Sequence, residues 1–452
     1  MVSVWAHTLY GAARAERLSP PVTARLMAYA SIALYSGLGA GDPSLAPVSG
    51  LVNGLPALPR GDAGPYDGGI VAVAAERAVL DSLLKEGLPT TTARIAHVAD
   101  SLESARTTRG ISNDLRARSE QLGREIATKI VAWSHSDGFD TTRGRPYAPP
   151  TGLAYWVNDT PTPLYASQNQ SGTSEFVAIG NPANVLQSGN ASARSLILNR
   201  PKRKDAKTLP PVNMTGVTEP YWVQLRPFVL KRWDECAPPE PPAYSPDKTS
   251  ALYQNADTVR TIRKTLTPEQ RAIAFYWADN AGETGTPVGH WTSIASQLAS
   301  ERHVSAEDAA RILMLTSLSQ ADAFIAAWGY KFKYVLIRPR TYIRRLQDST
   351  WEPLIPTPPF PEYPSAHSTQ SMAAATVLGS LIGDSVAFDD STGLSIGNPV
   401  RHFTSFRAAS EEAGISRIYG GIHFPYGNIG GRVLGKCVGE KVNERARAAG
   451  LH

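Results

Sequence analysis

Pro364-Ser365-Ala366-His367 opens the stretch PSAHSTQSMAAATVLGSLI, residues 364–382, in which a proline and a serine precede a run of small and apolar residues. This order predicts a helix over residues 366–382 that begins just after the serine. The first backbone N–H groups of a helix have no partner within it, and the helix dipole favours negative charge there. The stretch therefore predicts an anion pocket beside His367. The alternative is an ordinary serine cap with an incidental histidine.

Helical periodicity continues along most of the chain, whereas the alternation typical of strands is scarce. In the first half, helices are predicted over residues 20–35, 70–87, 91–108 and 111–135. In the second half, they are predicted over residues 249–265, 268–278, 289–300, 305–332, 366–382, 404–414 and 429–448. Residues 136–218 lack clear periodicity and are expected to form an extended, ordered excursion. The predicted fold class is all-α, with two four-helix-bundle-like units and long ordered loops.

The segment Pro238-Pro239-Glu240-Pro241-Pro242 is the candidate boundary between two halves. Residues 1–237 are expected to form an N-terminal helical half that includes the long excursion. Residues 243–452 are expected to form a C-terminal helical half that carries the anion site. A chain of 452 residues is long enough for one large domain or two ordinary ones, and one compact unit is expected.

The composition excludes several classes of protein. Hydrophobic residues make up 42% of the chain and charged residues 19%, which fits a globular protein with a sizeable core. The net charge of +5 is mild and the basic residues are dispersed, so no nucleic-acid partner is expected. No apolar run reaches the roughly 18 residues of a membrane helix, so no membrane partner is expected either. Cys236 and Cys437 lack metal-site spacing, and they could pair or stay reduced.

Lys331 and Arg338 are seven residues apart, which on a helix would place them on nearly the same face, about 10 Å apart along the axis. Pro339 disfavours helix at the residue before it, so the chain is expected to unwind there. The surrounding residues are mostly apolar and aromatic. This setting favours partly buried cations that need an anionic partner, although two surface cations with buried stems remain the alternative.

Arg417 and His423 are six residues apart, which on a continuous helix would place them about 120° apart around the axis. They can face one ligand only if the chain breaks between them, and Gly420-Gly421 offers such a break. An arginine fork suits tetrahedral oxyanions, and a neutral imidazole can bind a metal or attack phosphorus. A buried structural histidine is the alternative. Together the motifs predict a site for phosphoryl transfer or for a phosphate-like cofactor.

The three motifs, Lys331…Arg338-Pro339, Pro364–His367 and Ser416-Arg417…His423, resemble those of the superfamily of vanadium-dependent haloperoxidases and type 2 phosphatidic acid phosphatases. Residues 269–279, 351–359 and 403–406 also resemble bacterial haloperoxidases. The resemblance implies an all-α enzyme with vanadate as its cofactor. It implies that the residues holding the vanadate oxygens are Lys331, Arg338, Ser365, Ala366 through its N–H, and Arg417, while His423 bonds to vanadium.

The resemblance further implies the chemistry. His367 would be the acid–base group that deprotonates hydrogen peroxide, and Lys331 and His423 would also be catalytic. The bound peroxide would oxidise a halide to a hypohalous species that halogenates a small organic acceptor. Trp328 and Phe360 would line the halide pocket, and Asp279 would orient Arg417. Family habit favours a secreted or periplasmic enzyme whose signal has been removed, and a homo-oligomer is compatible with it.

The chain departs from the superfamily pattern at two positions. Ala366 replaces a glycine, and the backbone N–H survives that change. Gly427 stands four residues after His423, where the superfamily has an aspartate that supports the metal-bonding histidine. The loss of this acid predicts weaker cofactor binding unless Asn428 substitutes for it.

Two other functions use the same residues. In a soluble acid phosphatase of this superfamily, His423 would attack phosphorus and His367 would protonate the leaving group. A degenerate anion-binding relative is the third reading, and Gly427 motivates it. The length of the chain and the tryptophans around the motifs favour the haloperoxidase.

Overall fold

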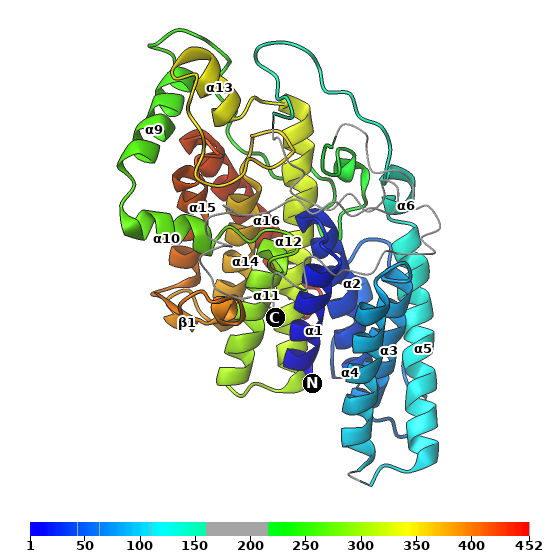
Figure 1. Ribbon diagram of the computed structural model, residues 1–452. Coiled ribbons are helices and arrows are strands. Elements are labelled where there is room, and N and C mark those ends of the chain that lie inside the picture. Colours follow the sequence, from blue (N-terminus) through cyan, green and yellow to red (C-terminus); the bar gives the residue numbers. More distant parts are fainter. Residues whose placement is uncertain (43, 63, 109, 160–215, 452) are drawn as a thin grey trace.

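The computed structural model describes residues 1–42, 44–62, 64–108, 110–159 and 216–451 (Figure 1). Its first half contains α1 (Val2–Ala15), α2 (Pro20–Leu38), α3 (Gly68–Leu83), α4 (Pro89–Thr107), α5 (Asn113–His135) and the short α6 (Phe139–Thr142). Its second half contains α9 (Ala251–Thr265), α10 (Pro268–Tyr276), α11 (Thr286–Glu301), α12 (Ala306–Tyr334), α13 (Pro339–Leu346), α14 (Ala366–Ile382), α15 (Phe406–Tyr419) and α16 (Pro425–Ala448). The predicted all-α class is confirmed.

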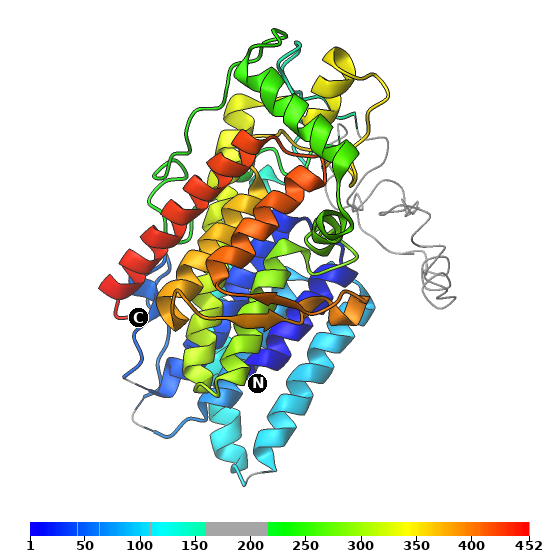
Figure 2. The same cartoon turned by 90° about the vertical axis from the view of Figure 1, so that its left-hand side faces the viewer.

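Two short strands are the exception to the helical architecture in the described part of the chain. β1 (Phe388–Asp390) pairs antiparallel with β2 (Arg401–Phe403), and Phe388 lies opposite Phe403. The hairpin crosses one end of the helices α14 and α15 (Figure 2). Three helices, α1, α6 and α13, also lie outside the predicted set, and α6 falls within the stretch expected to be an extended excursion. α13 has only eight residues and follows directly on Pro339, so it is too short to show a periodic apolar pattern.

α12 is the central helix of the molecule (Figure 1). It packs against α2 of the first half and against α11, α14 and α16 of the second. Such a helix must be apolar on all sides, and the residues from Ile312 to Lys331 are all buried. α12 is also the one helix, among the described residues, whose length and hydropathy would suffice to cross a membrane, and its apolar window lies entirely inside the protein.

α14 and α16 approach each other closely because glycines line the contact. A Cβ atom at Gly435 would lie 2.0 Å from the carbonyl oxygen of Thr369, and one at Gly439 would lie 2.8 Å from that of Ala373. Any side chain at these positions would push the two helices apart. α14 carries the predicted anion pocket at its N-terminus, so this close contact fixes the pocket relative to α16.

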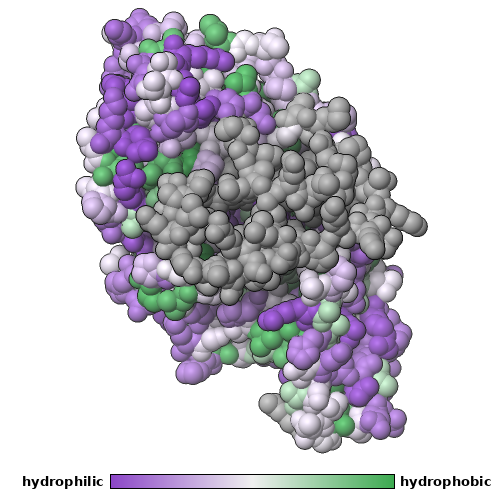
Figure 3. All heavy atoms as spheres, viewed as in Figure 1, coloured by the Kyte–Doolittle hydropathy of each residue, from purple (hydrophilic) through white to green (hydrophobic). Residues whose placement is uncertain are grey.

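The two predicted halves share a hydrophobic core. One cluster of buried side chains extends from Val2 to Leu451 and includes residues of α2, α3, α5, α12 and α16. α2 to α5 form one bundle, and α11, α12, α14, α15 and α16 form the other (Figures 1 and 2). Most of the predicted excursion, residues 160–215, lies outside the described residues. Hydrophilic side chains cover much of the face shown in Figure 3 at the α9–α13 end and at the α4–α5 end.

A disulfide joins Cys236 to Cys437, 201 residues further along the chain. It ties the loop before α9 to α16, and the loop is also held to α12. There the Asp322 carboxylate accepts hydrogen bonds from the N–H groups of Phe228, Val229 and Leu230 at 2.6–2.8 Å. The sequence left open whether the two cysteines pair or stay reduced, and in the structure they pair.

Replacing both cysteines, Cys236→Ala with Cys437→Ala, is expected to lower the free energy of unfolding by about 2–4 kcal/mol, because the cross-link restricts the unfolded chain. Urea unfolding of both proteins, with and without reductant, would measure the loss. Reductant should shift the midpoint of the natural chain and leave the double variant unchanged. A natural chain that is insensitive to complete reduction would contradict the prediction.

Candidate active site

Lys331 lies in the last turn of α12 and is fully buried. Its Nζ donates hydrogen bonds to the carbonyl oxygens of Pro361 and Glu362, both at 2.9 Å, and lies 5.1 Å from the centre of the Phe360 ring. Burial and the nearby Arg338 hold the pKa of Lys331 well below its usual range, against the opposing effect of Glu362. A bound anion would stabilise the protonated, charged form of Lys331.

Arg338 reaches the same place by a change of backbone direction. α12 ends at Tyr334, Val335 has φ +49°, and Arg338 has the extended conformation of the residue that caps α13. The predicted unwinding before Pro339 is therefore confirmed. The placement of Lys331 and Arg338 on one face of a continuous helix is wrong, because the helix ends between them. The fully buried guanidinium donates to the carbonyl oxygens of Phe360 at 2.9 Å and Ile422 at 2.8 Å.

α14 begins at Ala366, as the sequence predicts, and Ser365 is its N-cap. The Ser365 hydroxyl accepts a hydrogen bond from the N–H of Ser368 at 3.3 Å and lies 2.9 Å from the Ser368 hydroxyl. Ser365, the serine predicted to bind an anion, is therefore also the cap of α14. The helix N-terminus directs backbone N–H groups and the positive end of its dipole toward the pocket that Ala366 lines.

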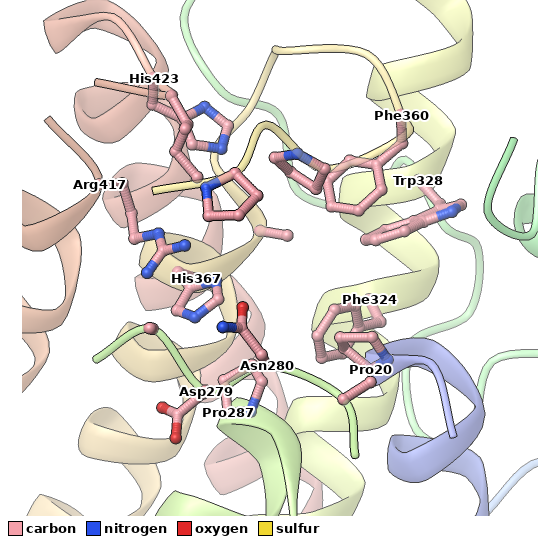
Figure 4. A pocket seen from close by; sticks show the side chains of 16 residues that line it. Pro20, Asp279, Asn280, Pro287, Phe324, Trp328, Phe360, His367, Arg417 and His423 are labelled. Atoms are coloured by element: carbon pink, nitrogen blue, oxygen red, sulfur yellow. The ribbon is translucent and has the colours of Figure 1, made fainter. Parts of the chain in front are cut away.

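His367 lines this pocket from the first turn of α14 (Figure 4). Burial, together with the charges of Arg417 and His290, holds its pKa well below the usual value, against a hydrogen bond with the backbone of Trp277. The imidazole is therefore neutral. Its Nε2 is buried and has no hydrogen-bond partner among the described residues. A neutral ring with an available nitrogen is suited to accept a proton from a bound substrate.

Arg417 and His423 meet because the chain breaks between them, as predicted. α15 ends at Tyr419, Gly421 has φ +77°, and α16 begins at Pro425. A Cβ atom at Gly421 would lie 3.1 Å from Pro353 in addition to the unfavourable φ, so the turn requires glycine. Arg417 donates to the carbonyl oxygen of Trp277 at 2.7 Å. Burial, followed by Arg338, Lys331 and Arg417, holds the pKa of His423 well below its usual value.

The pocket has a polar side and an apolar side. Figure 4 shows His423, Arg417 and His367 along one side, opposite Phe360, Trp328 and Phe324. The rings of Trp328 and Phe360 lie 5.0 Å apart, so both residues predicted for the halide pocket are in place. Pro20 of α2 and Asn280 complete the wall, and no motif in the sequence pointed to either residue.

Asp279 also lines the pocket, but its carboxylate contacts a different partner from the one predicted. It lies 2.9 Å from Nδ1 of His290, whose Nε2 lies 2.7 Å from Asp390. The predicted contact with Arg417 is replaced by an indirect one, because the His290 ring stacks on Trp277 at 4.4 Å and the Trp277 carbonyl accepts from Arg417. No motif in the sequence pointed to this buried Asp–His–Asp cluster, since Asp279 and His290 are 11 residues apart and Asp390 is 100 residues further along the chain.

The Asp–His–Asp cluster makes stability depend on pH. Although burial opposes it, Asp279 and Asp390 raise the pKa of His290 from 6.5 to about 10. A raised pKa adds stability that is fully present below pH 6.5 and lost as the pH rises through about 10. The free energy of unfolding is therefore expected to fall by about 4 kcal/mol over that interval. Denaturant unfolding at a series of pH values would measure the slope.

His290→Gln is expected to flatten this pH dependence and to lower stability near pH 6 by about 3 kcal/mol. His402→Gln is the matched control, because His402 forms a similar pair with Asp389 on the exposed hairpin. A natural chain whose stability is constant from pH 6.5 to 10 would contradict the assignment.

The donor set fits a tetrahedral oxyanion. Three buried cations, a serine hydroxyl and a helix N-terminus can bind its oxygens, and an imidazole nitrogen can bind its central atom. The described part of the chain has no group of three or more His, Cys, Asp or Glu side chains arranged to hold a metal cation. The site is thus built to bind negative charge, and a metal would enter it as an oxyanion.

Comparison with known proteins supports this interpretation. The family profile described as the second helical-bundle domain of VCPO matches residues 311–449, which contain all three motifs. The vanadium chloroperoxidase of Curvularia inaequalis is 26% identical over 220 residues, which cover 35% of this chain. The matched part spans only 36% of the length of that protein.

Solved structures resemble the whole chain. The crystal structure described as the first bacterial vanadium-dependent iodoperoxidase has a TM-score of 0.78 and 29% identity, and the similarity covers 97% of this chain and 94% of that one. A bacterial vanadium-dependent chloroperoxidase in its holo form has a TM-score of 0.64 and 16% identity, over 97% of this chain and 94% of that one. At that identity the second likeness concerns the fold alone.

Proposed function

We propose that this chain, which belongs to the family of vanadium-dependent haloperoxidases, uses vanadate and hydrogen peroxide to oxidise a halide to a hypohalous species that halogenates a small organic acceptor. The observation that carries the proposal is a pocket lined by Arg417 and two neutral histidines, with two more buried cations directly behind its wall. Nη1 of Arg338 lies 3.0 Å from Nε2 of His423, and Nζ of Lys331 lies 5.1 Å from the centre of the Phe360 ring. The likeness to an iodoperoxidase along nearly the whole chain supports it.

Each side chain has a binding role that its surroundings allow. Lys331, Arg338 and Arg417 would hold the vanadate oxygens, with the Ser365 hydroxyl and the N–H of Ala366. Nε2 of His423 would bond to the metal, because a neutral imidazole is a metal ligand. Bound vanadate supplies a Lewis acid that polarises peroxide without changing its own oxidation state.

His367 would perform the proton transfer. Its neutral ring would accept a proton from hydrogen peroxide at Nε2, the atom that has no other partner among the described residues. The cations would then stabilise the negative charge that develops on the peroxide oxygens. The halide would lie against the apolar side of the pocket, with Trp328 and Phe360, where Arg417 on the opposite side would compensate its charge.

A paired assay tests the proposal. The protein is loaded with orthovanadate, and oxidation of iodide, bromide and chloride by hydrogen peroxide is measured beside hydrolysis of an aryl phosphate without vanadate. We expect vanadate-dependent oxidation of at least one halide. Clear phosphatase turnover with no halide oxidation at any pH would identify the soluble phosphatase instead, and the absence of both activities would identify an anion-binding relative.

The proposal extends to the compartment in which the enzyme works. Disulfides persist in oxidising compartments, and the bond between Cys236 and Cys437 supports a secreted or periplasmic location. Fractionation of the producing cells, with thiol labelling of both cysteines, would test this. Recovery of the protein in the cytosol with free thiols would contradict it.

A further inference from the structure

Glu362 provides the carboxylate that contacts His423. This glutamate precedes α14, is fully buried, and lies 61 residues before the histidine in the chain. Its Oε1 lies 2.8 Å from Nδ1 of His423 and accepts a second hydrogen bond from the N–H of Phe424 at 3.0 Å. The backbone of Glu362 is held as well, because its N–H donates to Leu336 at 3.0 Å and its carbonyl accepts from Lys331.

The hydrogen bonds around His423 determine which nitrogen carries the proton. Nη1 of Arg338 lies 3.0 Å from Nε2 of His423, and a guanidinium can only donate. Nε2 is therefore the acceptor and Nδ1 carries the proton, which it donates to Glu362. The lone pair on Nε2 is the one that a metal would use, so the carboxylate holds the histidine in the tautomer needed for binding.

Gly427 and Glu362 compete for one space. A Cβ atom at Gly427 would lie 2.1 Å from Oε1 and 2.9 Å from Cδ of Glu362, so no side chain at position 427 can coexist with the observed carboxylate. Position 427 is the third residue of α16, from which an acid commonly reaches back to the N–H of the N-cap residue. Phe424 is that N-cap residue, and Glu362 already accepts from its N–H.

Asn428, the substitute that the sequence suggested, has a different role. Its Oδ1 accepts a hydrogen bond from the hydroxyl of Ser368 in α14 at 2.8 Å, and no hydrogen bond in the described part of the chain joins Asn428 to His423. The hypothesis that Asn428 replaces the missing acid is therefore wrong. The carboxylate that contacts His423 belongs to Glu362, in the segment before α14.

We propose that Glu362 is the positioning residue for the metal-bonding histidine, and that it takes over the role which the superfamily gives to an aspartate at position 427. Glycine at position 427 is then required, because only glycine leaves room for the Glu362 carboxylate. The inference rests on the proposed function only in naming vanadate as the ligand, since the tautomer of His423 can be observed without it.

The first experiment measures vanadate binding by equilibrium dialysis with metal analysis. Glu362→Ala is expected to weaken binding about 10–100-fold, the usual effect of removing such a partner. Glu362→Gln, which keeps an oxygen acceptor for Nδ1–H, should lose less. Gly427→Asp alone should also weaken binding, because its Cβ displaces the Glu362 carboxylate. Adding Gly427→Asp to Glu362→Ala should recover most of the lost affinity.

Two controls keep the result interpretable. Glu352→Gln removes a half-exposed carboxylate that pairs with Arg340, away from the pocket, and should bind vanadate as the natural chain does. Nitrogen NMR of His423 in the absence of vanadate reports the tautomer directly, and Glu362→Ala should shift it from Nδ1–H toward a mixture. Denaturant unfolding identifies any variant that fails to fold. If Glu362→Ala does not fold, the tautomer of His423 is compared between Glu362→Gln and the natural chain instead.

Unchanged vanadate affinity in a folded Glu362→Ala variant would overturn the proposal, as would an unchanged His423 tautomer or a failure of Gly427→Asp to improve on Glu362→Ala. If the natural chain binds no vanadate, the proposed function fails, and the NMR comparison still decides whether Glu362 controls the histidine.

Discussion

Replacing His423 by alanine is expected to abolish vanadate retention and lower halide oxidation at least about 1,000-fold, because Nε2 of His423 is the proposed metal ligand. The three cations would remain, so the variant should still attract oxyanions weakly. Metal analysis after gel filtration of the loaded protein would measure retention. Inorganic phosphate, which needs no bond from the histidine, should compete with vanadate far better in the variant than in the natural chain.

The control for this prediction is His402→Ala, which removes a largely exposed histidine of the β1–β2 hairpin. It should retain vanadate fully. If His423→Ala held vanadate as tightly as the natural chain, another residue would be the ligand and the assignment of the site would be wrong. A loss of folding in His423→Ala would be distinguished by unfolding measurements, with His423→Gln as the replacement because it fills the cavity.

Replacing His367 by alanine is expected to give the opposite pattern, with vanadate retained and turnover reduced about 100–10,000-fold. The side chain lines the same pocket as Arg417 and His423, and its proposed role is to accept a proton at Nε2. In the proposed site the cations, Ser365 and His423 would hold the anion without it. Dialysis should therefore give a vanadate affinity within a few-fold of the natural value, while the rate of halide oxidation falls.

The pH profile separates this role from a structural one. A lost proton acceptor should leave activity that rises with pH, as hydroxide and deprotonated peroxide replace the base. A variant that loses vanadate in parallel with activity would show that His367 binds the anion. One that keeps activity within tenfold of the natural chain would show that another group accepts the proton.

The fold class and the principal residues of the site were predictable from the sequence because they depend on local signals. Ser365 and Pro339 mark helix starts, and Gly420-Gly421 marks the break that lets Arg417 and His423 meet. Residue spacing was a poorer guide where the chain leaves a helix. Lys331 and Arg338 converge through an extended segment with a positive φ at Val335, which periodicity could not reveal.

By itself, the sequence determined which groups are candidates for binding an anion and where the helices that carry them begin and end. Capping, proline and glycine effects act within a few residues, so they can be recognised in one short stretch. Only the tertiary structure decided the partners of those groups: Glu362 for His423, and His290 with Asp390 for Asp279. Glu362 and His423 are 61 residues apart, and His290 and Asp390 are 100 apart, so tertiary packing determines which of these buried donors and acceptors meet. For the same reason, the sequence suggests that an acid has been lost at Gly427. In the structure, the missing side chain at Gly427 leaves the space that the Glu362 carboxylate fills.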